Sequence, residues 1–532
     1  MFLSFRPSTL LSCAVKNLVN HNWIMPKRSL SVPPVKKKLK SHHHQVNQRM
    51  VVPKCESPLS ADGSNLTGEN MTVSSTSSDV KIEEATANIK VEYLDTPIKS
   101  DNDKKEYRVI KLPNGLTALL IADLYTANGA CSDGKETSEN DAASSSTDSD
   151  SDCSSDEDAS DVSDTPEEMD NSDDEDASLR PPKKDEKMAA CGLCVGVGSF
   201  SDPPEIQGLA HFLEHMVFMG SKKYPLENDF DAFITKRGGS DNASTECEQT
   251  TFYFEIDEKH LLSALDRFAQ FFINPLMLRD AIAREREAVE SEFQMALPSD
   301  FYRKEQLFCS FAEAQHPATK FPWGNLVSLR DMVTDDKLYQ ELHNFRERHY
   351  SAHRMTVTIQ ARLPLDTLEN YVKQCFAKVP CNNLPPDDFT RFNGAKSFDT
   401  DHFRRIYKIK PIKDICQIEL TWAMPSLHHL YRAKPHQYVS WVIGHEGKGS
   451  LISYLRKKMW CLDVFSGNGE SGFEHSSMYA LFSLSLVLTD EGHSHLKEVL
   501  DAIFSYITMM RKLGPQKRIF DEIRMIEDTN FR

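Results

Sequence analysis

Hydrophobic residues follow regular patterns in some stretches of this chain and are sparse and irregular in others. Alternating or helical patterns run through 107–123 and return after residue 187, whereas residues 1–106 and 125–186 carry no sustained periodicity. Such polar segments bury too little apolar surface to offset the entropy lost on ordering. We therefore predict a disordered N-terminal tail over 1–106 and a disordered insertion at about 125–186.

The insertion interrupts a folded domain. Before it, YRVIKLPNGLTALLIAD at 107–123 predicts two strands joined by a turn at Pro113-Asn114-Gly115. After it, MAACGLCVGVGSF at 188–200 predicts another strand that leads toward a helix. The intervening residues must therefore leave the domain as a long surface loop, which costs little in closure entropy.

The later patterns divide into two blocks at 384–402, where the sequence is polar, contains proline and lacks periodicity. Strand and helix patterns alternate before the break, and those from 405 to 513 echo them in order. The pattern predicts an α+β protein with a domain over 107–390 and a related one over 391–532. Apolar runs are too short to span a bilayer, and 478–488 predicts a buried strand.

Charge adds a feature that the hydrophobic pattern does not show. The formal net charge is −17, and 141–176 alone holds 16 acidic residues with no lysine or arginine. This tract could attract basic peptides or basic protein partners, or it could be a solubilising, phosphorylatable loop. We expect no nucleic-acid partner.

The twelve cysteines are scattered without the spacing of a disulfide framework, which favours a reducing compartment. Cys191 and Cys194 face opposite sides of a predicted strand and are interpreted as core thiols. Residues 1–24 are somewhat like a mitochondrial presequence, Met25 is an alternative start, and 36–40 is a nuclear-localisation-like basic run. We expect a cytoplasmic protein, with mitochondrial or nuclear forms as alternatives.

Candidate chemistry lies in the motif HFLEH at 211–215. His211 and His215 are four residues apart, so a helix places both rings on one face, where they can chelate a metal ion. Glu214 lies beside them as a candidate general base, and the order H-x-x-E-H is the inverzincin signature. The alternative is that these are ordinary surface residues of an amphipathic helix.

A second helix is predicted over 279–297, and its apolar face contains Glu285 and Glu292, two helical turns apart. Buried carboxylates are costly unless they are paired or bind a metal. The two residues therefore indicate a metal ligand with a supporting carboxylate, or a buried salt bridge.

Three motifs give the chain a family resemblance: HFLEHMVFMGSKKYP at 211–225, GGSDNAST at 238–245 and EAVESE at 287–292. They resemble the pitrilysin/insulysin family of zinc metallopeptidases, and most closely its dibasic-cleaving member. The resemblance implies two related domains, each a sheet with helices on one side. It also implies one Zn²⁺ per chain on His211, His215 and Glu292, with Glu285 in support and Glu214 activating water. A preference for basic or dibasic peptide substrates is implied as well.

The resemblance assigns substrate contacts to two further places. Asn242 and Ala243 would begin an edge strand that pairs with a peptide, although the residues alone favour an ordinary turn into a strand. Gly444, Gly447 and Gly449 would anchor substrate termini, although alone they are a weak glycine loop without phosphate-binding spacing.

Family members have four such domains in two halves, whereas this chain stops at Arg532, within an incomplete second domain. We therefore expect that a C-terminal half, or a dimer partner, is needed to complete the enzyme. The alternative function is a catalytically impaired fragment that binds or regulates basic partners through the acidic tract.

Overall fold

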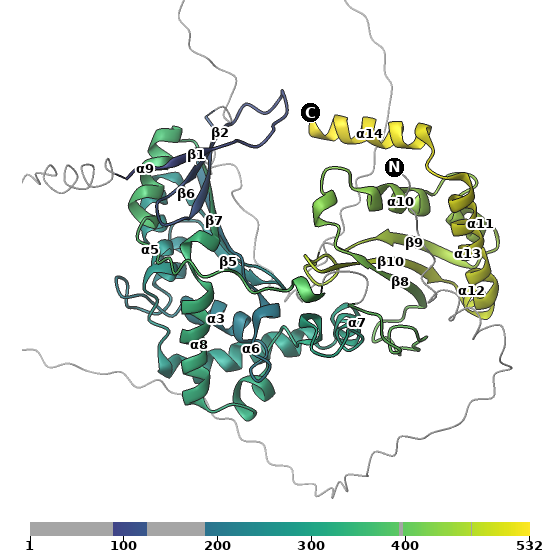
Figure 1. Ribbon diagram of the computed structural model, residues 1–532, viewed down its shortest axis with the longest axis horizontal. Coiled ribbons are helices and arrows are strands. Elements are labelled where there is room, and N and C mark those ends of the chain that lie inside the picture. The colour runs from purple at the N-terminus through teal and green to yellow at the C-terminus, as the bar shows by residue number, and fades with distance from the viewer. Residues whose placement is uncertain (1–88, 125–186, 393–396, 470) are drawn as a thin grey trace, which may run out of the picture.

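The computed structural model describes residues 89–124, 187–392, 397–469 and 471–532. Within these ranges the chain forms two bodies, each a sheet with packed helices (Figure 1). The predicted α+β class is confirmed. The predicted insertion at 125–186 and residues 1–88 of the predicted tail lie outside the described residues.

The first body contains a seven-stranded sheet in the order β1-β2-β3-β7-β4-β6-β5. β3 and β7 are parallel, and every other neighbouring pair is antiparallel. The predicted hairpin is present, and its turn contains Gly115 at φ +89°, a conformation that favours glycine. The strands are β1 (Glu92–Leu94), β2 (Glu106–Lys111), β3 (Thr117–Ala122), β4 (Met188–Val195), β5 (Ser240–Thr245), β6 (Thr250–Asp257) and β7 (Met355–Ala361).

β1 lies within the range that we predicted to be a disordered tail, so the structure differs from the prediction there. This three-residue strand pairs with β2, and the Tyr93 hydroxyl donates a hydrogen bond to Glu369 at 3.3 Å. The guanidinium of Arg108 also lies 5.9 Å from the centre of the Tyr93 ring. All three residues of β1 are exposed, so the strand has no alternation of buried and exposed side chains that the sequence could show.

Helices of the first body bury their apolar faces against this sheet. In α5, Phe268 and Phe272 follow the i, i+4 spacing of an amphipathic helix, and both rings contact aromatic residues of β6. Packing of this kind fixes the helices that carry the candidate chemistry. The helices are α3 (Leu209–Val217), α4 (Asp229–Thr235), α5 (Leu261–Ile273), α6 (Ile282–Ala296), α8 (Asp335–His349) and α9 (Leu365–Phe376), and α7 (Asp300–Cys309) packs in a separate cluster with residues of the second body.

The second body contains a three-stranded antiparallel sheet in the order β8-β10-β9. The predicted buried strand is its central strand, β10. Residues 405–409, which we expected to continue the regular patterns, form neither helix nor strand, and Ile406 is 58% exposed. The elements are β8 (Gln417–Pro425), α10 (Pro435–Gly444), α11 (Leu451–Lys457), β9 (Cys461–Gly467), β10 (Tyr479–Leu488), α12 (Asp490–Ser494), α13 (Leu496–Leu513) and α14 (Lys517–Phe531).

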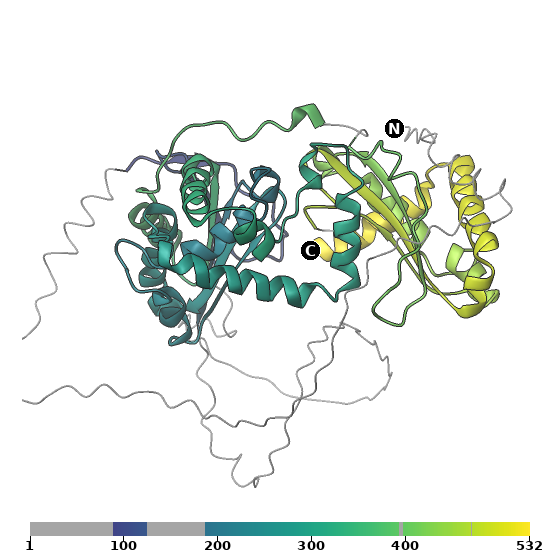
Figure 2. The ribbon, with the colours of Figure 1, turned by 90° about the horizontal axis from the view of Figure 1, so that it is seen from below.

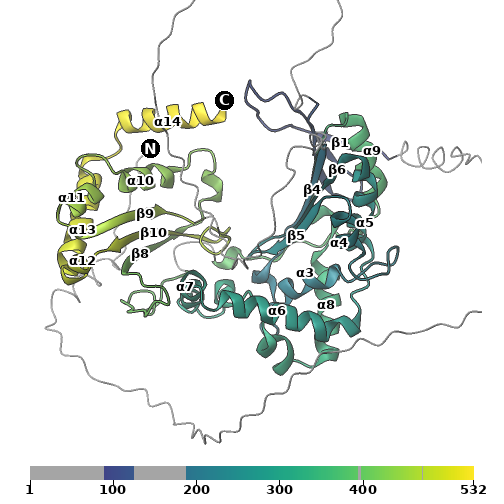
Figure 3. The same cartoon turned by 180° about the vertical axis from the view of Figure 1, so that it is seen from behind.

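The two bodies meet at several places, among them α7 and the end of the chain. Figure 2 shows α6 and α7 passing from one body to the other, and Lys304 of α7 forms an ion pair with Glu419 of β8. Figure 3 shows α14 extending toward the first body, where the Arg532 carbonyl accepts hydrogen bonds from Ser100 and Asn102. Among the described residues, no helix has the length and apolar character of a membrane span.

Candidate metal centre

Two helices of the first body bring three metal-ligand side chains together. His211 and His215 lie one turn apart on α3, and Glu292 lies on α6. The Nε2 atoms of His211 and His215 are 3.3 and 3.5 Å from the two carboxylate oxygens of Glu292. One ligand atom from each residue can be chosen so that all three lie within 4.8 Å of one another. Two imidazole nitrogens and one carboxylate oxygen form a donor set that suits zinc.

The start of α3 is held by a buried aspartate that we did not single out in the sequence. Asp202 is 1% exposed, and its carboxylate accepts hydrogen bonds from the backbone N–H groups of Gly208 and Ala210 at 2.7 and 2.8 Å. Burial raises the pKa of Asp202 to about 7 despite these bonds. The contact fixes the first turn of the helix, and therefore the direction in which His211 projects.

The orientation of His211 also depends on a close backbone approach. A Cβ atom added at Gly208 would lie 2.2 Å from the Gly324 Cα, and both glycines have positive φ. Only glycine fits at such a contact. It brings the Trp323 carbonyl oxygen to 2.6 Å from Nδ1 of His211. Because a carbonyl accepts and cannot donate, Nδ1 carries the proton and Nε2 keeps its lone pair for a metal.

A second carboxylate of α6 lies beside His215. Its Nδ1 atom is 3.8 Å from the carboxylate of Glu285, which also accepts a 3.1 Å hydrogen bond from Arg284. Burial lowers the pKa of His215, but the nearby carboxylates of Glu285 and Glu292 outweigh it and raise the pKa to about 9. The carboxylates around this ring therefore favour a positive charge at the centre, which a divalent cation would supply.

Glu214 lies on α3 between the two histidines and is 7% exposed. Burial raises the pKa of its carboxyl group, and the hydroxyl of Thr245 donates a hydrogen bond to it at 2.5 Å. A carboxylate with a raised pKa is better suited to accept and return a proton. Thr245 is a further contact that the sequence analysis missed, because the two residues are 31 positions apart.

The structure places the predicted peptide-binding residues on β5, the last strand of the large sheet. β5 pairs with β6 on one side, and no described strand pairs with its other side. Asn242 and Ala243 lie in this strand, three and two residues before Thr245. The strand that supports the carboxyl group of Glu214 therefore also presents an open edge.

The predicted glycines lie apart from this group, in the second body. Gly444 ends α10, while Gly447 and Gly449 lie in the turn before α11. Gly449 has φ +90°, so glycine is favoured there by the backbone. Their assignment to substrate termini stays a prediction.

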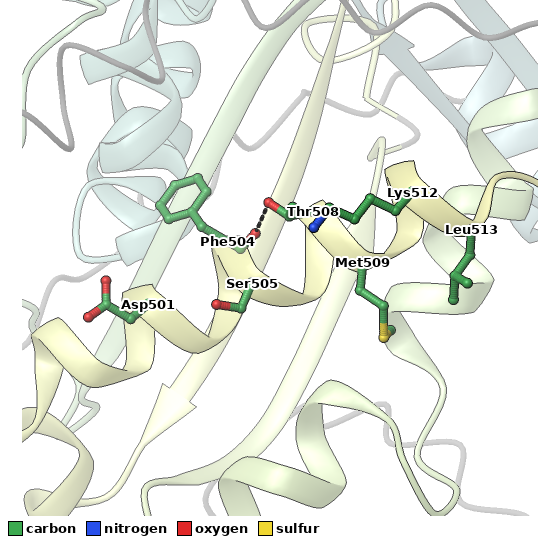
Figure 4. Close-up of a pocket in the computed structure, with 7 residues that line it drawn as sticks. All are labelled: Asp501, Phe504, Ser505, Thr508, Met509, Lys512 and Leu513. Atoms are coloured by element: carbon green, nitrogen blue, oxygen red, sulfur yellow. Dashed lines mark hydrogen bonds between the residues drawn. The ribbon is translucent and has the colours of Figure 1, made fainter.

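A hollow on α13 offers no comparable chemistry. Figure 4 shows side chains from one side of this helix, with the Thr508 hydroxyl donating a hydrogen bond to the Phe504 carbonyl at 2.7 Å. Asp501 and Lys512 are its charged residues, and they sit at opposite ends of the hollow. The converging groups of α3 and α6 are therefore the better candidate site.

Two family models match this chain. The sequence model described as Insulinase (Peptidase family M16) matches residues 181–315, which contain α3, β5 and α6. The model described as Peptidase M16 inactive domain matches residues 337–527. The two ranges together span more than half of the chain.

Curated relatives match most of this chain but extend well beyond it. Nardilysin of Pongo abelii is 47% identical over 498 residues, which cover 90% of this chain and 43% of that protein. A nardilysin-like protein of Arabidopsis thaliana is 38% identical and covers 82% and 42%. Insulin-degrading enzyme of Bos taurus is 34% identical and covers 82% and 36%. The chain spans less than half the length of these relatives.

Solved structures show the same architecture. The crystal structure of pitrilysin superimposes with a TM-score of 0.65 at 26% identity, over 83% of this chain and 40% of that chain. A protease from Helicobacter pylori shares the fold with a TM-score of 0.55 at 16% identity, over 80% and 85%. The chain belongs to the insulinase family of peptidases, M16, and is similar within it to nardilysin.

Proposed function

We propose that this chain carries the catalytic machinery of a zinc metalloendopeptidase. The observation that carries the proposal is the meeting of His211, His215 and Glu292, with Glu214 beside them. In the proposed assignment the first three residues bind one Zn²⁺. When bound, the ion supplies a Lewis acid that polarises a peptide carbonyl and lowers the pKa of water.

Glu214 serves as the general base and then as the general acid. Its carboxylate accepts a proton from the attacking water, and the same proton passes to the amine that leaves when the peptide bond breaks. Burial raises the pKa of this carboxyl group, which favours its acceptance of the proton, and the hydroxyl of Thr245 holds its orientation. Glu285 is assigned a supporting role, because it lies beside His215 without belonging to the ligand group.

The open edge of β5 is the proposed substrate track. An extended peptide that pairs with this edge would have its backbone fixed by main-chain hydrogen bonds while its side chains remain variable. The strand leads to Thr245 and hence to Glu214, so a paired peptide would run toward the reacting groups. Gly444, Gly447 and Gly449 are retained as proposed anchors for substrate termini.

The proposed substrates are peptides with basic or dibasic sites. Similarity to nardilysin supports this preference, as does the net charge of −17. Because the relatives are more than twice as long, full activity is proposed to need a C-terminal half or a partner. The proposed location is cytoplasmic, with mitochondrial or nuclear forms.

A cleavage assay tests the proposal. Purified protein should hydrolyse a dibasic peptide when the chain is combined with the C-terminal half of a nardilysin, and a zinc chelator should stop the reaction. Glu214→Gln in the same mixture is the matched control for a contaminating protease. Hydrolysis that survives both the chelator and Glu214→Gln would contradict the assignment.

A further inference from the structure

One irregular segment, residues 320–326, runs past both helices that carry the metal-ligand side chains. It lies between two short helical turns, Pro317–Thr319 and Val327–Asp331. None of its residues is exposed. The backbone groups of a buried segment need hydrogen-bond partners, and outside a helix or sheet those partners must come from neighbouring elements. The contacts of segment 320–326 divide between α3 and α6.

The first part of the segment is held at the start of α3. The backbone N–H of Phe321 donates a 2.7 Å hydrogen bond to the side chain of Gln207, two residues before the helix begins. The Trp323 carbonyl oxygen, 2.6 Å from Nδ1 of His211, belongs to the same segment. One end of segment 320–326 is therefore attached to a metal-ligand residue.

The other part of the segment is held by α6. The backbone N–H of Leu326 donates a 2.8 Å hydrogen bond to the carboxylate of Glu290, which lies two positions before Glu292 on that helix. The rings of Phe321 and Phe293 also meet edge to face, with their centres 5.5 Å apart. Segment 320–326 is therefore a bridge between the helix of the two histidines and the helix of the third ligand.

Direct polar contacts between the two helices are longer than those of the bridge. Within the described ranges, the ion pairs that join α3 to α6 run from His211 and His215 to Glu285 and Glu292, at 3.3, 3.5 and 3.8 Å. The three hydrogen bonds of the bridge measure 2.6, 2.7 and 2.8 Å. Hydrogen bonds weaken as they lengthen beyond about 3 Å, so the bridge is the firmer connection.

We propose that segment 320–326 sets the spacing of α3 and α6 before a metal binds, with Glu290 as its positioning residue on α6. This role rests on the proposed function and deepens it. Ligands that are already in place lose less conformational freedom on binding, so the affinity is higher. Groups outside the ligand set that orient metal ligands typically contribute 10–100-fold to metal affinity.

Substitutions of Glu290 separate the hydrogen bond from the charge. Glu290→Ala removes the acceptor of the Leu326 N–H, whereas Glu290→Gln keeps an acceptor oxygen without the charge. We expect zinc to bind about tenfold more weakly to Glu290→Ala and within about twofold of the native affinity to Glu290→Gln. Competition with a chromogenic chelator measures zinc affinity. The visible spectrum of bound Co²⁺, which reports ligand geometry, should change only in Glu290→Ala. An equal loss in Glu290→Gln would assign the effect to charge and overturn the proposal.

The α3 end of the bridge provides an independent pair of variants. Gln207→Ala removes the acceptor of the Phe321 N–H and should weaken zinc binding, whereas Gln207→Glu keeps an acceptor and should not. If the segment acts as one connection, breaking either end releases it. Gln207→Ala/Glu290→Ala should then bind zinc about as weakly as the weaker single variant. Losses that multiply would indicate two separate local effects and overturn the proposal.

Two controls make the affinities comparable. Histidines 42–44 can bind metal in every variant, and their share is measured in His211→Ala and subtracted. Circular dichroism of the metal-free proteins checks folding, and the Gln207 pair supplies the test if Glu290→Ala unfolds. Unchanged zinc affinity and an unchanged cobalt spectrum in the alanine variants would overturn the proposal and leave the zinc assignment standing. A native protein that binds no zinc at His211 would overturn both.

Discussion

Nδ1 of His211 donates a hydrogen bond to the Trp323 carbonyl oxygen, so Nε2 is the ring nitrogen that is left to bind a metal. The motif HFLEH places the histidines correctly because i, i+4 spacing is a property of the helix itself. The contacts of Trp323 and Asp202 could not be predicted. The first depends on the close approach of Gly208 and Gly324, and the second on a buried carboxylate that accepts hydrogen bonds from the start of α3. Such contacts leave no pattern along the sequence.

The first prediction separates metal binding from proton transfer. Glu214→Gln should retain about one zinc per chain and lower peptide hydrolysis by at least about 100-fold, because general-base catalysis typically contributes 10²–10⁴. His211→Ala and Glu292→Gln should lose zinc as well as hydrolysis. Zinc content by mass spectrometry and cleavage by the chain combined with a C-terminal half give the two readouts. Zinc loss in Glu214→Gln equal to that in His211→Ala would make Glu214 a structural residue.

β5 shows what the pattern of a single strand can and cannot reveal. The family resemblance implied an edge strand at Asn242 and Ala243, and β5 is the last strand of the sheet. The residues alone indicated only a turn into a strand, because a position at the end of a sheet follows from the pairing order. The same limit explains β1, which has too few residues to show alternation. Long amphipathic segments such as α5 and β10 were predictable because burial of one face sets their periodicity.

The open edge of β5 gives a second prediction. Ala243→Pro removes one backbone N–H, so a peptide that pairs with this edge should bind about three- to tenfold more weakly, the effect of one hydrogen bond. Affinity is measured with the zinc-loaded Glu214→Gln protein, which binds without cleaving. Ala243→Ser keeps the N–H and serves as the matched control. Unchanged affinity in Ala243→Pro would argue against pairing at β5.

The junction of the two bodies holds more carboxylates than cations. Burial and the nearby Glu474 raise the pKa of Glu305 to about 7, while Lys304 is paired with Glu419. A carboxyl group with a raised folded-state pKa favours folding below its unfolded pKa, and this contribution is lost as pH rises through 7. Ionised Glu305 should therefore weaken the junction in mildly alkaline solution.

Glu305→Gln should remove that loss. At pH 8 we predict that the variant melts a few degrees above the native protein, which corresponds to a free energy of unfolding that is about 1–2 kcal/mol larger. At pH 4.5 the two proteins should melt at the same temperature. Thermal unfolding at the two pH values provides the measurement, and Glu313→Gln at an exposed position on the same connection is the control. A difference of the same size at both pH values would exclude titration as its cause.

The acidic tract at 141–176 lies outside the described residues, and its role as a binding segment stays a prediction. Its deletion should leave zinc content and melting unchanged but weaken the binding of basic peptides. The loss should be larger at low salt, because exposed charges are screened beyond about 8 Å at physiological ionic strength. Titration calorimetry at two salt concentrations checks this, and a salt-independent loss would argue for specific contacts.

Division into two sheet-and-helix bodies was predictable from repeated patterns on either side of 384–402. Contacts across the junction were not, because they join residues far apart in sequence, such as Ser477 and Glu248. The matched region is 43% of the nardilysin of Pongo abelii, so the activity of that whole protein is a proposal for this chain. The three proposed metal ligands lie on α3 and α6, which are both in the first body, so we expect this body to bind the metal by itself.

X-ray absorption at the zinc edge tests the central claim most directly. The account predicts two imidazole nitrogens and carboxylate or water oxygens at about 2.0–2.2 Å, with no sulfur, in the 532-residue protein loaded with one zinc. Glu292→Gln should weaken zinc binding. A sulfur shell at about 2.3 Å would place the metal on cysteines instead. That result, together with an unchanged zinc affinity in Glu292→Gln, would contradict the assignment of His211, His215 and Glu292.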